Sequence, residues 1–230
     1  MKVTLIGHTN DPLGTICTAI ATMKAKHPLQ YVLARVDIQK EDMVKEIMKT
    51  RLRGALEFAS FEFLVEGVTR AFTHQLVRHR TFHFSQQSMR FFDASESGFR
   101  VPQVDSPLSK EINEMSIRIF DTYGDLIDHG CPIEDARSIL PTNVLTSISF
   151  GATYRGLIDL AEVRMCLQTQ AEFREFMDLL KSEIQSVSPF LGSLLMPVCK
   201  RTGRCEFKSI FDRPCPLRSA ERRTDNGIRT

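Results

Sequence analysis

Apolar residues in the first part of the chain fall into short runs separated by stretches of helical spacing. The runs at 3–6, 31–36 and 56–65 are rich in β-branched or aromatic residues, which predicts three strands. Between them, apolar residues recur every three or four positions after Asp11 and again over 41–52. These two segments are expected to be helices, the first with Asp11 as its N-cap.

Helical spacing dominates the second half of the chain. Amphipathic patterns cover 109–129, 153–164 and 170–187, and a shorter helix is expected over 131–140. The segment 143–150 is apolar and hydroxyl-rich, and it fits neither period. Because strands come first and helices follow, we expect an α+β protein. The expected architecture is one domain with a small mixed or antiparallel sheet flanked by long helices.

A short helix is expected in the middle of the chain, where Thr69 can serve as its N-cap. On that helix Gln75, Arg78 and His79 are three and four positions apart, so they would share one face. Arg80 does not fall on that face, and we expect the helix to end near it. The helix would then deliver polar side chains to a single surface.

This helix lies at the start of a basic stretch, in which no Asp or Glu occurs from 67 to 92. Arg78, Arg80 and Arg90 lie in it, interleaved with His, Gln and Ser. Guanidinium groups bind phosphate oxygens in bidentate fashion, so the stretch suits an anionic, planar ligand. Residues 81–85 alternate polar and aromatic, as an extended segment would. Composition alone leaves two other interpretations open, a solvated loop and a patch for nucleic acid.

Composition and charge are ordinary for a soluble globular protein, with 42% hydrophobic and 25% charged residues. No apolar run is long enough for a membrane span, and the N-terminus lacks a signal-peptide pattern, so a cytoplasmic location is expected. The formal charge is +2, but residues 200–230 carry nine Lys or Arg against four Asp or Glu. We therefore expect a main domain over 1–198 and a basic, cysteine-containing tail over 199–230.

Six cysteines are present, and three of them lie near the C-terminus. Cys199, Cys205 and Cys215 have the spacing C-x5-C-x9-C, which is not a standard zinc spacing. Cys166 or a histidine could supply a fourth ligand. Unpaired thiols are favoured over structural zinc, and no metal ligand is assigned from the sequence.

The order of residues in the basic stretch is more specific than its composition. Arg78-His79-Arg80, followed after seven residues by Ser88, resembles the signature of the flavin-dependent thymidylate synthases, the ThyX family. Gln75 before it and Arg90 after it also fit. Downstream, the segment 136–141 resembles the family's A-R-x-x-L-P motif, and Arg155, Arg164 and Gln170-Ala171-Glu172 complete the pattern. The resemblance extends from about Glu57 to Arg174.

The resemblance implies methylation of dUMP at C5 to give dTMP. The carbon would come from methylenetetrahydrofolate and the hydride from FAD reduced by NADPH, in a homotetramer with shared active sites. Arg164 would contact the pyrimidine and promote ionisation of its N3. The implied nucleotide-binding residues are Gln75, Arg78, Gln86, Ser88, Arg90 and Arg137. The implied flavin-binding residues are Arg78, His79, Arg80, Gln86, Arg155 and Asp159.

The chain also departs from the family pattern. Gln86 stands where the family usually has Glu, and Asp159 and Thr153 stand where some members have Asn. Of the family's H-x-[ST]-x-x-E-H segment only Glu57 is present in 52–58. Gln86 therefore leaves an alternative, an enzyme of the same family that alkylates C5 of UMP or dCMP. A nucleic-acid-binding protein that uses 70–90 and the tail is a further alternative, although the scarcity of aromatic residues in the tail disfavours it.

Overall fold

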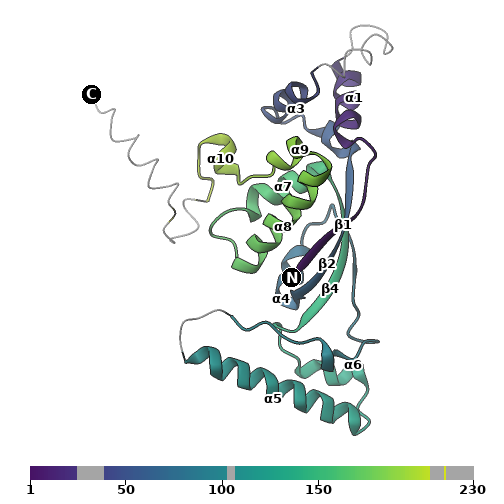
Figure 1. The fold of residues 1–230 in the computed structure, drawn as a ribbon, viewed down its shortest axis with the longest axis vertical. Coiled ribbons are helices and arrows are strands. Elements are labelled where there is room, and N and C mark those ends of the chain that lie inside the picture. The colour runs from purple at the N-terminus through teal and green to yellow at the C-terminus, as the bar shows by residue number, and fades with distance from the viewer. Residues whose placement is uncertain (25–38, 103–106, 208–214, 216–230) are drawn as a thin grey trace, which may run out of the picture. The chain divides into compact units, whose positions relative to one another are not determined.

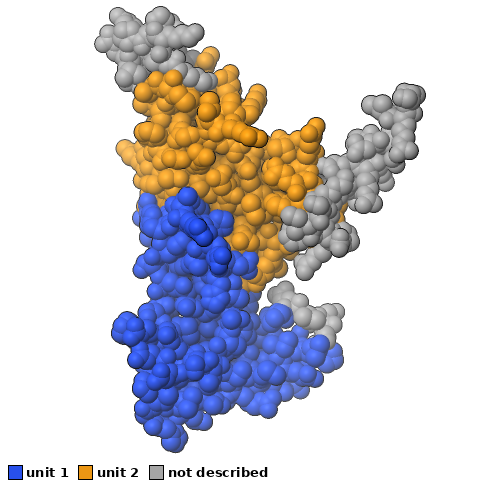
Figure 2. Space-filling view, turned by 180° about the vertical axis from the view of Figure 1, so that it is seen from behind, with its two compact units in different colours: residues 1–6, 62–151 blue, residues 7–61, 152–230 orange. Residues whose placement is uncertain are grey.

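The structure is a computed structural model that describes residues 1–24, 39–102, 107–207 and 215 (Figure 1). Two compact units are distinguished in Figure 2, and they are described in turn. Unit 1 comprises residues 1–6 and 62–151, and unit 2 comprises 7–61 and 152–230. The predicted strand at 31–36 and most of the expected tail lie outside the described residues. The division into 1–198 and 199–230 therefore stays a prediction.

The described residues form one four-stranded sheet with the strand order β1-β2-β4-β3. Its strands are β1 (Lys2–His8), β2 (Ser60–Thr69), β3 (His83–Gln86) and β4 (Leu145–Thr153). The segment that fitted neither period is thus the strand β4, which pairs antiparallel with β3, placing Phe84 opposite Phe150. An α+β fold with a small sheet is confirmed.

The strand predicted at 56–65 begins later than expected. Its first residues belong to the 3-10 helix η1 (Gly54–Phe58), and β2 starts at Ser60. In η1 the consecutive residues Ala55 and Leu56 are both buried, whereas a strand would point them to opposite faces. The burial of two neighbours therefore favours a helical turn here.

In unit 1, the helix α4 (Arg70–Leu76) begins as predicted, because the Thr69 hydroxyl accepts a hydrogen bond from the Phe72 backbone N–H at 3.0 Å. It ends earlier than expected. Arg78 N–H bonds to the Gln75 carbonyl and His79 N–H to the Leu76 carbonyl, which is the tighter i→i−3 pattern of a terminal turn. The shared helical face predicted for Gln75, Arg78 and His79 is therefore wrong, since only Gln75 lies in the helix.

The rest of unit 1 is helical. It contains η2 (Ala94–Glu96), α5 (Leu108–Asp128), α6 (Ile133–Ala136) and η3 (Arg137–Ile139). A separate core joins these elements around Tyr123, whose hydroxyl accepts from the Ala94 N–H at 3.1 Å. The helix predicted at 131–140 is shorter and ends in a 3-10 turn, because Leu140 adopts the extended backbone favoured before a proline.

Unit 2 is mainly helical. Its first helices are α1 (Pro12–Lys24) and α3 (Lys40–Met48). They are followed by α7 (Tyr154–Arg164), α8 (Ala171–Val187), α9 (Pro189–Ser193) and α10 (Val198–Thr202). Asp11 caps α1 as predicted, since its carboxylate accepts from the Gly14 N–H at 3.0 Å. Tyr154 is fully buried and donates to the Leu191 carbonyl at 2.8 Å, which ties α7 to α9.

None of the helices in the described part of the chain is long and apolar enough to cross a membrane.

Candidate functional site

The turn after α4 presents two arginines at the surface of unit 1. Arg78 and Arg80 are exposed, whereas His79 between them is half-buried. The His79 ring stacks on Phe82 with centroids 5.4 Å apart, and Phe82 stacks on Phe150 of β4 at 5.8 Å. This aromatic column anchors the turn to the sheet. It holds both guanidinium groups in solvent, where they can meet an anionic ligand.

The strand that follows packs closely against β4 at one point. The ring of His83 lies against Gly151, where an added Cβ would come within 2.0 Å of Nε2. With the His83 ring in this position, only glycine fits at residue 151. Thr81, His83 and Ser85 are exposed while Phe82 is buried, as the alternation of polar and aromatic residues predicted.

Gln86 is oriented by a residue that the sequence did not single out. Its Nε2 donates to the Thr73 hydroxyl at 3.0 Å, and that hydroxyl in turn donates to the Arg70 carbonyl at 3.0 Å. Thr73 is buried, and because its own proton is committed to the Arg70 carbonyl, its hydroxyl can serve Gln86 only as an acceptor. A carboxylate at position 86 has no proton to donate at neutral pH, so the amide matches this partner.

Ser88 and Arg90 lie in an exposed turn. The Ser88 hydroxyl accepts from the Arg90 N–H at 3.3 Å. The Arg90 guanidinium pairs with Glu134, with Nε and Nη2 lying 2.9 and 2.8 Å from the same oxygen. The nearest acid in the sequence, Asp93, bonds to Ser95 instead, and the fold supplies the partner of Arg90 from α6. Arg90 is therefore held in place by a residue from 44 positions away.

Arg137 joins the same surface of unit 1. Its Nε donates to the Glu134 carbonyl at 3.0 Å. Burial, and next the positive charge of Arg137, lower the pKa of Arg70, so the two like charges act on each other. Arg70 and Glu134 are absent from the predicted set. Glu134 could have been noticed in the sequence, because it lies about one helical turn before Arg137. Arg70 therefore adds positive charge near Arg137.

In unit 2, the predicted residues lie on α7, whose N-terminus is capped by the Thr153 hydroxyl accepting from the Gly156 N–H at 3.3 Å. Arg155 pairs with Glu57 at 3.0 Å and lies 4.0 Å from Asp159. Partial loss of hydration, and next the charge of Glu162, raise the pKa of Asp159. Thr153 thus caps the helix as an Asn at this position would, so having Thr instead of Asn here preserves the start of α7.

Arg164 occupies the other end of α7. Its guanidinium lies over the Phe173 ring of α8, 4.7 Å from the centroid, and burial lowers its pKa. Arg155 and Arg164 are nine positions apart, so they are separated by about 13 Å along the helix. A single ligand would therefore have to be large to reach both arginines. Phe173, which orients Arg164, was expected only as an apolar helix residue.

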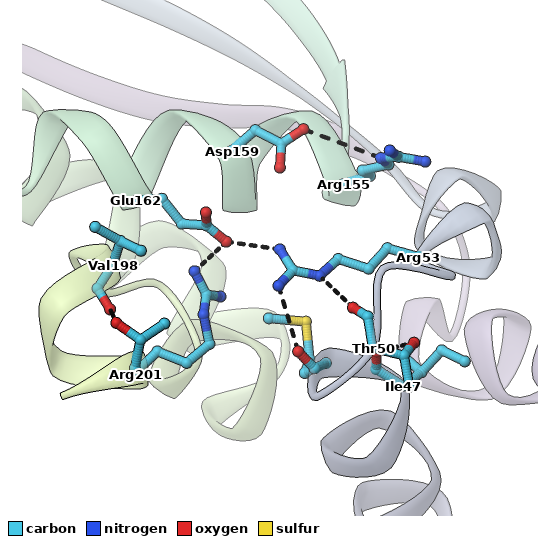
Figure 3. A network of polar contacts seen from close by, with 10 residues as sticks. Ile47, Thr50, Arg53, Arg155, Asp159, Glu162, Val198 and Arg201 are labelled. Atoms are coloured by element: carbon cyan, nitrogen blue, oxygen red, sulfur yellow. Dashed lines mark hydrogen bonds and ion pairs between the residues drawn. The ribbon is translucent and has the colours of Figure 1, made fainter. Parts of the chain in front are cut away.

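A separate network in unit 2 uses arginine in a structural way (Figure 3). Glu162 pairs with Arg53 at 2.7 Å and also with Arg201 of α10. The Arg53 guanidinium further donates to the carbonyls of Met48 and Thr50 at 3.3 and 3.2 Å. Burial, rather than any partner, is the main cause that lowers the pKa of Arg201. This network ties α7, α10 and the segment after α3 together.

An α+β fold that exposes arginines on an anchored turn is suited to binding an anionic ligand. The sequence model described as "Thymidylate synthase complementing protein" matches residues 4–190. The chain belongs to this family.

Curated relatives agree with that assignment, and a solved structure shares the fold. The flavin-dependent thymidylate synthase of Geobacter sulfurreducens is 34% identical over 89% of this chain and 90% of its own length. That of Pyrococcus horikoshii is 31% identical over 96% of both. A flavin-dependent thymidylate synthase of Helicobacter pylori, solved with FAD and dUMP, has a similar fold with a TM-score of 0.72. At 18% identity it covers 85% of this chain and all of that chain.

Proposed function

We propose that this protein is a flavin-dependent thymidylate synthase, which methylates dUMP at C5 with methylenetetrahydrofolate as the carbon donor. One observation from the structure supports it most directly. The His79–Phe82–Phe150 column holds Arg78 and Arg80 at the surface of a chain that belongs to the family. A nucleic-acid-binding function is not favoured, because the curated relatives match almost the whole chain and carry an enzyme's name.

FAD fits the residues present. Two exposed guanidinium groups at Arg78 and Arg80 suit a diphosphate, and Arg155 with Asp159 offers a donor and an acceptor on α7. We assign flavin binding to Arg78, His79, Arg80, Gln86, Arg155 and Asp159. Bound FAD, once reduced by NADPH, would supply the hydride. The residues of this chain bind and orient it.

The nucleotide would be bound by the second group of residues in unit 1. Arg90 and Arg137 are both positioned by Glu134, and Ser88 adds a hydroxyl beside Arg90. We assign nucleotide binding to Gln75, Arg78, Gln86, Ser88, Arg90 and Arg137, and we add Arg70. Ser88 acts as a ligand rather than a nucleophile, because its hydroxyl accepts from the Arg90 N–H and no general base in the described part of the chain is bonded to that hydroxyl.

Arg164 would activate the pyrimidine. Methylation requires C5 to become nucleophilic, and negative charge drawn onto the N3–C4–O4 edge achieves this. A guanidinium that is half-buried and fixed over Phe173 stabilises such charge strongly, because less water competes with it. The planar fork can also contact two atoms of the base edge at once.

A homotetramer in the cytoplasm with active sites shared between subunits completes the proposal. The exposed Arg78 and Arg80 would then contact ligand that another subunit also holds. Sedimentation equilibrium would measure the assembly, and mixing Arg78→Ala with Arg164→Ala subunits would test sharing. Recovery of activity on mixing is expected if each site draws residues from different subunits.

The decisive experiment is turnover of dUMP, UMP and dCMP with methylenetetrahydrofolate and NADPH, after flavin loading. We expect a yellow protein and a product from dUMP only. Gln86→Glu is the matched variant, because it loses the proton that Thr73 accepts. Absence of flavin binding would overturn the proposal, and preference for UMP or dCMP would instead identify the alternative enzyme of the same family.

A further inference from the structure

Four of the six cysteines line one pocket of unit 2. Cys166, Cys199, Cys205 and Cys215 contribute to the wall of a cavity of about 350 Å³. Cys166 lies just beyond the end of α7, Cys199 lies in α10, and the other two follow α10. The remaining cysteines are elsewhere, Cys17 buried in α1 and Cys131 between α5 and α6. This clustering brings Cys166 from far upstream to the three C-terminal thiols.

The six cysteines, each of which lies in the described part of the chain, form no disulfide with one another. Asp178 and Glu206 also line the pocket and make it attractive to a cation. Among the residues described, no three such side chains already stand at ligating distances. The thiols would therefore have to move closer together on binding.

We propose that Cys166, Cys199, Cys205 and Cys215 bind one Zn²⁺ ion as a four-thiolate structural site. Four sulfur donors select zinc or an iron–sulfur cluster, and tetrahedral Cys₄ coordination is usual for structural zinc. The spacing C-x5-C-x9-C lacks the closely spaced runs typical of cluster proteins, which favours the single ion. Binding releases thiol protons to solvent and needs no oxidant or reductant.

The site would fasten three parts of unit 2. Cys166 comes two residues after Arg164, and Cys199 comes two residues before Arg201 of the Glu162 network. A bound ion would therefore fix the end of α7, the short helix α10 and the segment that follows it. Because metal binding favours the folded state, zinc should also raise the stability of the chain.

The test uses the full-length protein, purified under reducing conditions without chelator. Plasma mass spectrometry should find about one zinc ion per chain. Cys199→Ser and Cys215→Ser should each lose at least about nine-tenths of it, since a structural site needs all four ligands. Cys131→Ser is the matched control, because that thiol is also half-buried but lies outside the pocket, and it should keep its zinc. Cobalt should give thiolate charge-transfer bands in the wild type and in this control only.

A second measurement does not depend on variants that fold. Alkylation of the native wild type, read by mass spectrometry, should spare the four pocket thiols until a chelator is added, while Cys131 reacts in both conditions. Four results would each overturn the proposal. The first two are a wild-type protein that keeps no zinc after dialysis against zinc, and equal zinc contents in Cys199→Ser and Cys131→Ser. The other two are bound iron with sulfide, and disulfides among these cysteines. Flavin binding and turnover are measured separately, so failure here leaves the proposed enzyme untouched.

Discussion

Arginine has opposite uses in the two units. In unit 2, Arg53 and Arg201 share Glu162, and all three side chains are largely covered, with exposed fractions of 21, 15 and 20%. In unit 1, Arg78 and Arg80 are exposed on a turn that His79 anchors. The covered arginines need their carboxylate because an unpaired buried charge is costly. The exposed ones carry no such requirement and are available to a ligand.

The difference separates residues that hold the fold from residues that serve chemistry, although their side chains are identical. Variants of the first kind should change the free energy of unfolding. Variants of the second kind should change binding or rate and leave stability nearly unaltered. Arg164 is intermediate, since it is half-buried like the first kind but packs against a ring. It therefore gives the sharpest test.

Arg164→Ala should lower the single-turnover rate of flavin oxidation by about 100- to 1000-fold at saturating dUMP, because charge grows on the pyrimidine in the transition state. Nucleotide affinity, measured by titration, should fall less. Arg164→Lys keeps the charge but not the planar fork, and it should also be slow. If the saturated rate is unchanged while dUMP binds weakly, Arg164 is an anchor, and Arg90 or Arg137 becomes the candidate for activation.

Glu162→Gln should destabilise the protein by roughly 2–4 kcal/mol, because two partly buried guanidinium groups lose their carboxylate. Urea denaturation followed by circular dichroism measures this. The control is Glu66→Gln, whose pairing with Lys2 at 4.0 Å is exposed. That change should cost less than about 0.5 kcal/mol. Equal midpoints for the two variants would contradict the structural role assigned to the network.

Arg78→Ala should weaken flavin binding by about 10- to 100-fold, the loss expected for a charge-assisted contact to phosphate. The free energy of unfolding from urea denaturation should stay within about 0.5 kcal/mol of the wild type, because the side chain is exposed. Flavin affinity comes from equilibrium titration of absorbance. His79→Ala is the informative companion, since it should disturb the turn as well as the ligand. Unchanged flavin affinity in Arg78→Ala would remove this arginine from the flavin site.

Ser88→Ala should retain measurable turnover, with a loss of about 0.5–1.5 kcal/mol in transition-state stabilisation, as for one hydrogen-bonding hydroxyl. An essential nucleophile would instead leave almost no activity. Steady-state kinetics with dUMP separate the two outcomes. A folded variant that binds dUMP but never turns over would show that Ser88 does more than bind.

The smallest effect concerns a charge that serves the fold alone. The bond from Gly14 N–H is the largest cause that lowers the pKa of Asp11, followed by contributions of opposite sign from burial and from Lys40. A lowered folded-state pKa means that this stability is present above the unfolded pKa near 3.8 and is lost as the pH falls through the folded value. Asp11→Asn keeps a cap, so it should cost under about 1 kcal/mol at pH 7 and flatten the acid limb of the stability curve. If the free energy of unfolding falls between pH 4 and 3 as steeply in the variant as in the wild type, other carboxylates cause that fall.

The sequence by itself determined most of the local structure. Asp11, Thr69 and Thr153 mark helix starts because their side chains satisfy backbone N–H groups within the next turn. The alternation in 81–85 correctly separated buried from exposed positions. The signature around 78–90 indicated the family that the profile match established. Each of these depends on neighbours in the chain, so it can be read locally.

Other features were decided only in three dimensions. Glu134 reaches Arg90, Thr73 orients Gln86, and Phe173 supports Arg164, and none of these partners is marked by spacing. Burial does alternate along β4 from Leu145 to Phe150, but the sequence did not reveal it, because the buried positions include the polar Thr146 and the less buried ones include the apolar Leu145. The position of Cys166 near the C-terminal thiols was also decided by the tertiary structure, because it depends on how α7 packs against α10. Contacts between distant segments depend on packing rather than on local pattern, and packing is a property of the folded chain.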